Sequence, residues 1–197
     1  MRRAIVFGLA FCVAATCYRS FIHTPSPRMA ADSAGAADAP AGAVELQILD
    51  WEGVQKLLAS KKGKIVVLDA WSTSCVPCVR EFPNLVGLHK RLGKDVACVS
   101  LSCDYAGIKS KPPEFYREKV LKFLTKQNAR FDNVLSALPS DETYEKLGIA
   151  SIPAVFVYGR DGKLVKRFDN ETIKSDDEEF TYADITKVVE AELAKSK

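Results

Sequence analysis

Hydrophobic residues recur in two patterns along the chain, helical spacing and short continuous runs. Helical spacing predicts helices over 51–60, 75–92, 115–127, 143–147 and 185–193. Continuous β-branched and aliphatic runs predict strands over 64–70, 96–102, 154–158 and 164–168. The glycines of the segment 159–163 predict a hairpin turn between the last two strands. This order of elements predicts an α/β domain with a mixed central β-sheet flanked by helices.

The first 24 residues follow a different pattern. Arg2 and Arg3 precede an apolar stretch that ends at Cys17, shorter than the about 20 residues of a membrane-spanning helix. We therefore expect residues 1–24 to be a signal peptide or an uncleaved membrane anchor, and the protein to be extracytoplasmic (periplasmic, secreted or membrane-anchored). Lipid attachment at Cys17 and an organelle-targeting presequence are the alternatives.

Residues 25–44 are dominated by Ala, Pro, Gly and Ser, and such a composition predicts a flexible linker. Residues 45–197 then form one domain, whose 47% hydrophobic and 27% charged composition (whole-chain values) is that of a soluble globular protein. The net charge of +3 comes without a basic stripe interleaved with aromatic residues, so no nucleic acid partner is predicted. We expect a monomer that meets the membrane only through its N-terminal segment.

The sequence Cys75-Val-Pro-Cys78 follows a predicted buried strand and opens a predicted helix. Positions i and i+3 are neighbours on a helix, so a disulfide can close between these two cysteines. Cys75 lies at the helix N-terminus, where unpaired N–H groups and the helix dipole favour a thiolate. The pattern therefore predicts Cys75 as nucleophile and Cys78 as resolving thiol, with Pro77 rigidifying the pair.

Paired cysteines also occur in zinc sites, which is the competing interpretation of this motif. Such a site needs two more ligands, and His89, eleven residues beyond Cys78, is roughly 16 Å away along a helix. We therefore predict no metal and no cofactor. Cys98 and Cys103 lie on opposite faces of an extended strand and cannot pair, so Cys98 is expected in the core, whereas an accessory redox role stays open for Cys103.

Asp69 lies within an apolar run, where burial is costly for a carboxylate and raises its pKa. A base there can take the proton of Cys78 when a mixed disulfide is resolved. The alternative is an edge strand that turns Asp69 toward solvent. Farther along, Ile152-Pro153 precedes a strand, where a proline is either an ordinary strand-entry residue or a cis residue.

Together these residues resemble the thioredoxin superfamily, specifically the TlpA/ResA-like extracytoplasmic thiol-disulfide oxidoreductases that include cytochrome c maturation reductases. The resemblance lies in three segments: Val-Leu-Asp-Ala-Trp-Ser-Thr-Ser-Cys-Val-Pro-Cys-Val-Arg-Glu-Phe-Pro over 67–83, Gly-Ile-Ala-Ser-Ile-Pro over 148–153, and Gly-Arg-Asp-Gly-Lys over 159–163. The resemblance covers the chain from about Leu46 to its C-terminus and implies a thioredoxin-like fold.

The resemblance also implies roles for individual residues. Pro153 would be a cis-proline facing a redox-active Cys75–Cys78 disulfide, and the Ile152 backbone would pair with an extended substrate. Asp69 matches the buried acid of thioredoxins, and Glu81 is an accessory residue in the Cys-x-x-Cys-x-x-Glu-x-Pro continuation of the TlpA group. The remaining substrate-facing positions are Trp71, Ser74, Val76 and Pro77. Ser74 departs from the Trp of most relatives, and the segment 104–118 is longer than in the shortest thioredoxins.

We therefore expect a thiol-disulfide oxidoreductase that reduces protein disulfides outside the cytoplasm. Its partners would be a disulfide-containing protein substrate and an electron donor from the membrane or a thioredoxin system. A peroxiredoxin-like peroxidase is one alternative, although the Pro-x-x-x-Thr/Ser-x-x-Cys loop of that class is missing before Cys75. A non-enzymatic thioredoxin-fold module that binds peptides is the other.

Overall fold

The computed structural model describes residues 43–169, 171 and 180–195. The expected leader (1–24) and the expected linker, apart from its last two residues, lie outside the described residues, and so does Cys17. Within the described part of the chain, no helix combines the length and the apolar character needed to cross a membrane.

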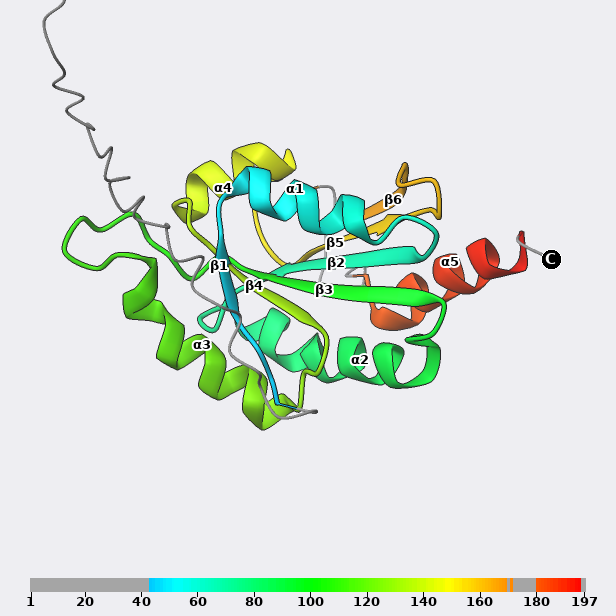
Figure 1. Ribbon diagram of the computed structural model, residues 1–197, viewed down its shortest axis with the longest axis horizontal. Helices are drawn as coiled ribbons and strands as arrows, with labels where there is room; N and C mark the ends of the chain where they lie inside the picture. Colours follow the sequence, from blue (N-terminus) through cyan, green and yellow to red (C-terminus); the bar gives the residue numbers. More distant parts are fainter. Residues whose placement is uncertain (1–42, 170, 172–179, 196–197) are drawn as a thin grey trace, which may run out of the picture. The chain divides into compact units, whose positions relative to one another are not determined.

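A single six-stranded sheet forms the centre of the described domain (Figure 1). Its strands, in the order they lie side by side, are β1 (Gln47–Leu49), β4 (Asp132–Ser136), β3 (Val96–Ser102), β2 (Ile65–Trp71), β5 (Ala154–Tyr158) and β6 (Leu164–Asp169). The first four are parallel, whereas β5 and β6 run antiparallel to their neighbours. This confirms the predicted mixed sheet, with β2 inside it rather than at an edge.

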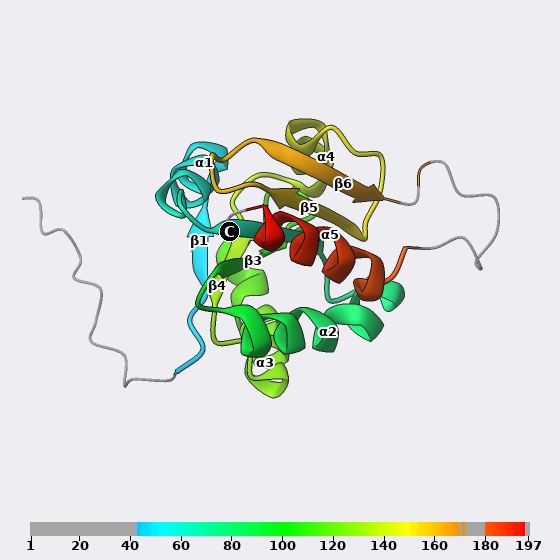
Figure 2. The ribbon, with the colours of Figure 1, turned by 90° about the vertical axis from the view of Figure 1, so that its right-hand side faces the viewer.

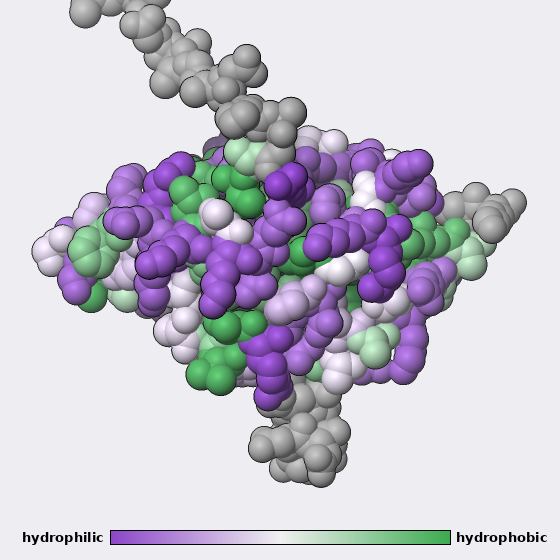
Figure 3. Space-filling model, turned by 90° about the horizontal axis from the view of Figure 1, so that it is seen from below, coloured by the Kyte–Doolittle hydropathy of each residue, from purple (hydrophilic) through white to green (hydrophobic). Residues whose placement is uncertain are grey.

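Helices cover both faces of the sheet (Figures 1 and 2). On one face lie α1 (Trp51–Ser60) and α4 (Ser140–Leu147), and on the other lie α2 (Val76–Leu92), α3 (Pro113–Gln127) and α5 (Tyr182–Ala194). Each face has its own hydrophobic core. Figure 3 looks toward the side formed by α2 and α3, where hydrophilic residues cover most of the surface, as expected for amphipathic helices.

All five predicted helices and four predicted strands are present, but three helices begin earlier than the hydrophobic spacing indicated. The residues added at the starts of α3 and α4 are proline and polar residues, which carry no hydrophobic period. The α5 helix gains one turn that begins at Tyr182. Pro113 opens α3 without loss of a hydrogen bond, because the first N–H groups of a helix have no partner within it. The end of α4 is marked in the sequence by Gly148, which follows the helix with a φ of 70°, a conformation that glycine adopts readily.

Two strands, β1 and β4, were not predicted. β1 has only three residues, too few to show a pattern. β4 contains the buried polar residue Asn133, whose amide nitrogen donates to the carbonyl oxygens of Glu45, Ala129 and Phe131, while its oxygen accepts from the Ser100 hydroxyl. A buried polar side chain in a strand is stable only with such partners, and two of them, Glu45 and Ser100, come from distant segments.

Candidate active site

The two cysteines of the motif lie where β2 leads into α2. Cys75 is the N-cap of α2, Pro77 is in its first turn, and Cys75 and Cys78 form a disulfide with their Cα atoms 5.3 Å apart. The backbone N–H of Cys78 points at the Cys75 sulfur, 3.3 Å away. Cys75 is partly exposed, whereas Cys78 is only 3% exposed. A second thiol or disulfide from outside therefore meets Cys75 first.

A cis-proline faces this disulfide. The Ile152–Pro153 peptide bond is cis, and the Ile152 carbonyl oxygen lies 3.8 Å from the Cys75 sulfur. The structure thus brings together two motifs that are 77 residues apart in sequence. On the same rim Val76 is 77% exposed and Ser74 is also exposed, so both are available to a partner chain.

Asp69 lies in the middle of the sheet, because β2 is hydrogen-bonded to β3 on one side and to β5 on the other. The edge-strand alternative is therefore wrong. The carboxylate is 5% exposed and accepts a hydrogen bond from the Tyr182 hydroxyl. Burial raises the pKa of Asp69 from 3.8 to about 7, against the Tyr182 hydrogen bond, which lowers it. Such a carboxyl exchanges its proton near neutral pH.

Asp69 and Cys78 line the same small cavity, together with Glu81 and Pro153. Its volume of about 10 Å³ is close to the least space that holds one water molecule. Glu81 is half-buried at this cavity and accepts a hydrogen bond of 2.9 Å from Asn84. The arrangement places a titratable carboxyl beside the inner sulfur, with room for a proton carrier between them.

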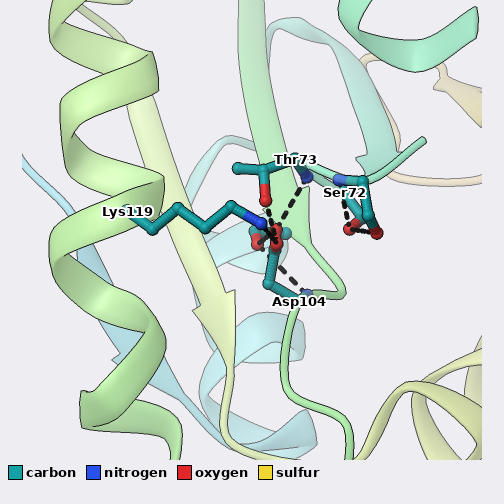
Figure 4. A network of polar contacts seen from close by, with 6 residues as sticks. Ser72, Thr73, Asp104 and Lys119 are labelled. Atoms are coloured by element: carbon teal, nitrogen blue, oxygen red, sulfur yellow. Dashed lines mark hydrogen bonds and ion pairs between the residues drawn. The ribbon is translucent and has the colours of Figure 1, made fainter. Parts of the chain in front are cut away.

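A second carboxylate, Asp104, accepts hydrogen bonds from the loop that precedes Cys75 (Figure 4). Its oxygens accept hydrogen bonds from the Thr73 backbone N–H at 3.0 Å, from the Thr73 hydroxyl and from the Ser102 hydroxyl at 2.7 Å. The Lys119 ammonium of α3 lies 4.0 Å away. Within the loop, Ser74 contacts the Ser72 hydroxyl at 2.9 Å. These contacts fix the backbone that leads into the reactive cysteine.

The structure corrects the expected place of Trp71. Its ring is fully buried and packs against Phe82 and Phe123, with ring centroids 4.7 and 4.8 Å away. As the last residue of β2, Trp71 points into the core beneath α2. The implied direct contact with a substrate is therefore wrong, and Trp71 supports the loop from below.

The other two described cysteines are not part of the site. Cys98 and Cys103 are both free and buried, and they belong to the cores on opposite faces of the sheet, as their odd spacing predicted. Burial raises the pKa of Cys98 to about 12 and the pKa of Cys103 beyond that range. Cys103 also faces away from Cys78, which leaves no support for an accessory redox role in this conformation.

Tyr182, Thr73 and Asp104 were missed from the sequence as parts of the site. The polar residues Ser102 and Asp104 at the carboxyl end of a buried strand gave a signal, because ligands and functional groups gather at that edge of α/β sheets. Tyr182 gave none, since it lies 113 residues from its partner and its contact follows only from the packing of α5.

Comparison with known proteins places this site in a family. Residues 37–167 match the model of the AhpC/TSA family. The thiol-disulfide oxidoreductase ResA of Bacillus thuringiensis subsp. konkukian is 29% identical over 134 residues, which cover 68% of this chain and 70% of that protein.

Two solved structures have the same fold. A DsbE thiol:disulfide interchange protein from Chlorobium tepidum is 23% identical, with a TM-score of 0.53 over 69% of this chain and 84% of that one. A secreted Mycobacterium tuberculosis disulfide oxidoreductase is 21% identical, with a TM-score of 0.51 over 68% and 85%. The fold is thus thioredoxin-like, as the resemblance implied. The chain belongs to the AhpC/TSA family and is a thiol-disulfide oxidoreductase related to ResA.

Proposed function

We propose that this protein reduces disulfide bonds of other proteins outside the cytoplasm, through its Cys75–Cys78 dithiol. The observation that carries the proposal is the partly exposed Cys75 sulfur at the start of α2, opposite the Ile152 carbonyl and next to the buried Cys78. One accessible and one sheltered thiol suit a two-step exchange.

In the first step the Cys75 thiolate attacks one sulfur of the substrate disulfide. A bond forms between Cys75 and that sulfur, the substrate S–S bond breaks, and the second substrate sulfur leaves as a thiolate that takes up a proton. The helix N-terminus stabilises the attacking thiolate, because the Cys78 N–H in the first turn of α2 points at the Cys75 sulfur and the helix dipole favours negative charge there.

In the second step the Cys78 thiol gives its proton to the Asp69 carboxylate, directly or through one water, and attacks the Cys75 sulfur. The Cys75–Cys78 bond forms, the mixed disulfide breaks, and the first substrate sulfur leaves as a thiolate. The substrate has gained two electrons and the protein has become a disulfide. Asp69 suits this task because its pKa of about 7 allows it to accept and release a proton at neutral pH.

The substrate surface of this proposal is formed by residues around the two sulfurs: Ser74, Val76, Pro77, Ile152 and Pro153. The Ile152 backbone would pair with an extended segment of the substrate, while the exposed Val76 side chain contacts it on the other side. Glu81 is an accessory residue that lines the small cavity beside Asp69 and Cys78.

The extracytoplasmic location is supported by the secreted Mycobacterium tuberculosis relative and by the leader pattern of residues 1–24. Disulfides persist in such compartments, so the oxidised protein needs electrons from a membrane donor or a thioredoxin system. The alternative is that residues 1–24 are a presequence that directs the protein to an organelle. Fractionation of cells carrying the tagged full chain distinguishes the two.

Reduction of insulin disulfides tests the activity. The wild-type protein should catalyse it, Cys75→Ser should abolish it, and Cys98→Ala should keep it, because Cys98 is a buried thiol outside the site. Equal activity of wild type and Cys75→Ser would instead support a peptide-binding module without thiol chemistry.

The direction of transfer and the partner need separate measurements. Equilibration of the Cys75–Cys78 couple with glutathione gives its reduction potential, and a value as high as that of a strong oxidase would overturn the reductive direction. The variant Cys78→Ala should stall as a mixed disulfide in the native compartment. Mass spectrometry of the trapped complex then identifies the substrate.

A further inference from the structure

The C-terminal helix supplies a buried hydroxyl to the base proposed above. Tyr182, the first residue of α5, is 5% exposed, and its hydroxyl donates a hydrogen bond to the carboxylate of Asp69 in the middle of the sheet. The two residues also line the same small cavity as Cys78. A tyrosine hydroxyl is thus built into the proton path of the inner thiol.

Two contacts of the neighbouring residues hold Tyr182 in this position. On its N-terminal side, Phe180 packs against Phe168 of β6, with ring centroids 5.7 Å apart. Around it, Thr181 and Asp184 form a capping box that spans Tyr182, in which the Asp184 carboxylate accepts from the Thr181 N–H at 3.2 Å and from its hydroxyl at 2.9 Å. The start of α5 is therefore fixed independently of the hydrogen bond to Asp69.

We propose that Tyr182 is a positioning residue for thiol exchange: its hydroxyl holds the Asp69 carboxylate beside Cys78 and sets the pH range in which that carboxylate accepts the Cys78 proton. This inference rests on the proposed function, because it assumes that Asp69 acts as the base. It adds a residue from α5, an element outside the cysteine motif.

The physical basis is that the hydrogen bond from Tyr182 favours the ionised form of the Asp69 carboxyl. The Tyr182 hydroxyl keeps its proton, since burial and the nearby Asp69 carboxylate raise its pKa far above neutral pH, and it donates that proton in its hydrogen bond to the ionised Asp69 carboxylate. A donor stabilises the ionised carboxylate and so opposes the effect of burial on the Asp69 pKa. Without the donor, Asp69 would be mostly protonated at neutral pH, and a smaller fraction of the molecules could take the proton of Cys78.

The hydrogen bond that lowers the pKa of Asp69 comes from Tyr182, and several other ionisable groups lie near the same carboxylate. From α2, Cys78, Arg80 and Glu81 line the cavity, and Glu81 carries the same charge as Asp69. From the β3 side, Cys98 and Cys103 are coupled electrostatically to Asp69 but stay protonated. The β5 side presents Pro153 and Val155, which are not ionisable. Among the described residues, Tyr182 is the side chain with a hydrogen bond to the Asp69 carboxylate.

A pH-jump experiment on the full chain measures this effect. The reduced protein is converted at acidic pH to its mixed disulfide with 5-thio-2-nitrobenzoate, and release of the coloured thiolate after the jump reports attack by Cys78. In the wild type, the rate should rise with a midpoint near pH 7. In Tyr182→Phe, the midpoint should move up by about one unit or more, because a hydrogen bond to a charged group is lost. At pH 7 the rate then falls about five-fold, and the two proteins converge above pH 9.

Four comparisons keep the result interpretable. Tyr158→Phe removes a tyrosine hydroxyl on the other face of the sheet and should leave the midpoint unchanged. Asp69→Asn should remove the midpoint, and adding Tyr182→Phe to that variant should change nothing further. Infrared titration of the Asp69 carboxyl band, identified by its loss in Asp69→Asn, should show the same upward shift in Tyr182→Phe without any turnover.

The possible failures are distinct. A wild type that releases no thiolate, or an Asp69→Asn variant with the wild-type profile, overturns the proposed function of the dithiol or of Asp69. The role of Tyr182 is overturned if the wild type and Asp69→Asn behave as expected but a folded Tyr182→Phe has the kinetic midpoint and the infrared pKa of the wild type. Equal slowing by Tyr182→Phe in both backgrounds overturns it as well.

Discussion

Thr73 and Asp104 are joined by two hydrogen bonds across the carboxyl ends of β2 and β3, one from the Thr73 backbone and one from its hydroxyl (Figure 4). Thr73 lies two residues before Cys75, so this buried carboxylate anchors the backbone that carries the nucleophile. The same hydrogen bonds give the buried polar groups of Thr73 their partners and fix the backbone that leads to Cys75. The pair therefore links the stability of the domain to the geometry of the disulfide.

Removal of the Asp104 carboxylate should lower the stability of the protein and loosen the backbone that positions Cys75. We expect Asp104→Ala to lower the free energy of unfolding by about 2 kcal/mol, because hydrogen bonds to a charged acceptor are lost and the Thr73 N–H is left without its partner. Urea denaturation of the oxidised protein measures the change. Glu118→Ala, an exposed carboxylate on α3, should stay within about 0.5 kcal/mol of the wild type.

A double-mutant cycle with Thr73→Val isolates the hydroxyl contact. The two substitutions should be non-additive by about 1 kcal/mol, since each removes the same hydrogen bond. Strict additivity would mean that the Thr73 hydroxyl and the Asp104 carboxylate do not interact in solution.

Asp69 should make stability depend on pH in the direction opposite to that of an ordinary paired acid. Its pKa is about 7 in the folded protein against 3.8 for an unperturbed carboxyl, so the folded state binds more protons between these values. Stability therefore falls as pH rises from about 4 to about 7. Relative to Asp69→Asn, the wild type should lose about 2 to 3 kcal/mol of unfolding free energy between pH 5 and pH 8.

Denaturation of both proteins at the two pH values measures this difference. Asp95→Asn, which changes an exposed carboxylate, should follow the wild type at both. A constant gap between wild type and Asp69→Asn would show that the buried carboxyl does not titrate in this range.

Much of this site could be predicted from the sequence because its signals are local. The buried run of β2 and the spacing of Cys75 and Cys78 lie within one stretch of chain, so pattern and chemistry fall on the same residues. The same run also placed Asp69 inside the sheet, since a strand that is apolar on both faces is covered on both.

What could not be predicted depends on contacts between distant segments. Asn133 is satisfied inside β4 partly by the distant Glu45 and Ser100, and Tyr182 meets Asp69 only once α5 packs on the sheet. The misplacement of Trp71 has a similar cause. A tryptophan beside a reactive motif suits both a binding surface and a core, and the rings of Phe82 and Phe123 decide for the core.

The four described cysteines should differ sharply in reactivity. In the reduced native protein, iodoacetamide should modify Cys75 first, because its sulfur is partly exposed at a helix N-terminus where the thiolate is favoured. Cys98 and Cys103 should react only after denaturation, since burial keeps both thiols protonated. Peptide mapping by mass spectrometry assigns each modification, and early labelling of Cys103 would contradict the buried position found for it.

Val76 offers a test of the substrate surface that is separate from folding. Its side chain is 77% exposed next to the nucleophile, so Val76→Glu should change the free energy of unfolding by less than about 0.5 kcal/mol. The same substitution should raise KM for insulin reduction several-fold with a smaller change in kcat, because a charge replaces an apolar contact to the bound segment. Leu164→Glu is the matched control, as Leu164 is a 52% exposed hydrophobic residue on β6, outside the surface proposed for the substrate. If both substitutions leave KM unchanged, the protein substrate does not cover Val76, and the contact surface must lie on the Ile152 side of the disulfide.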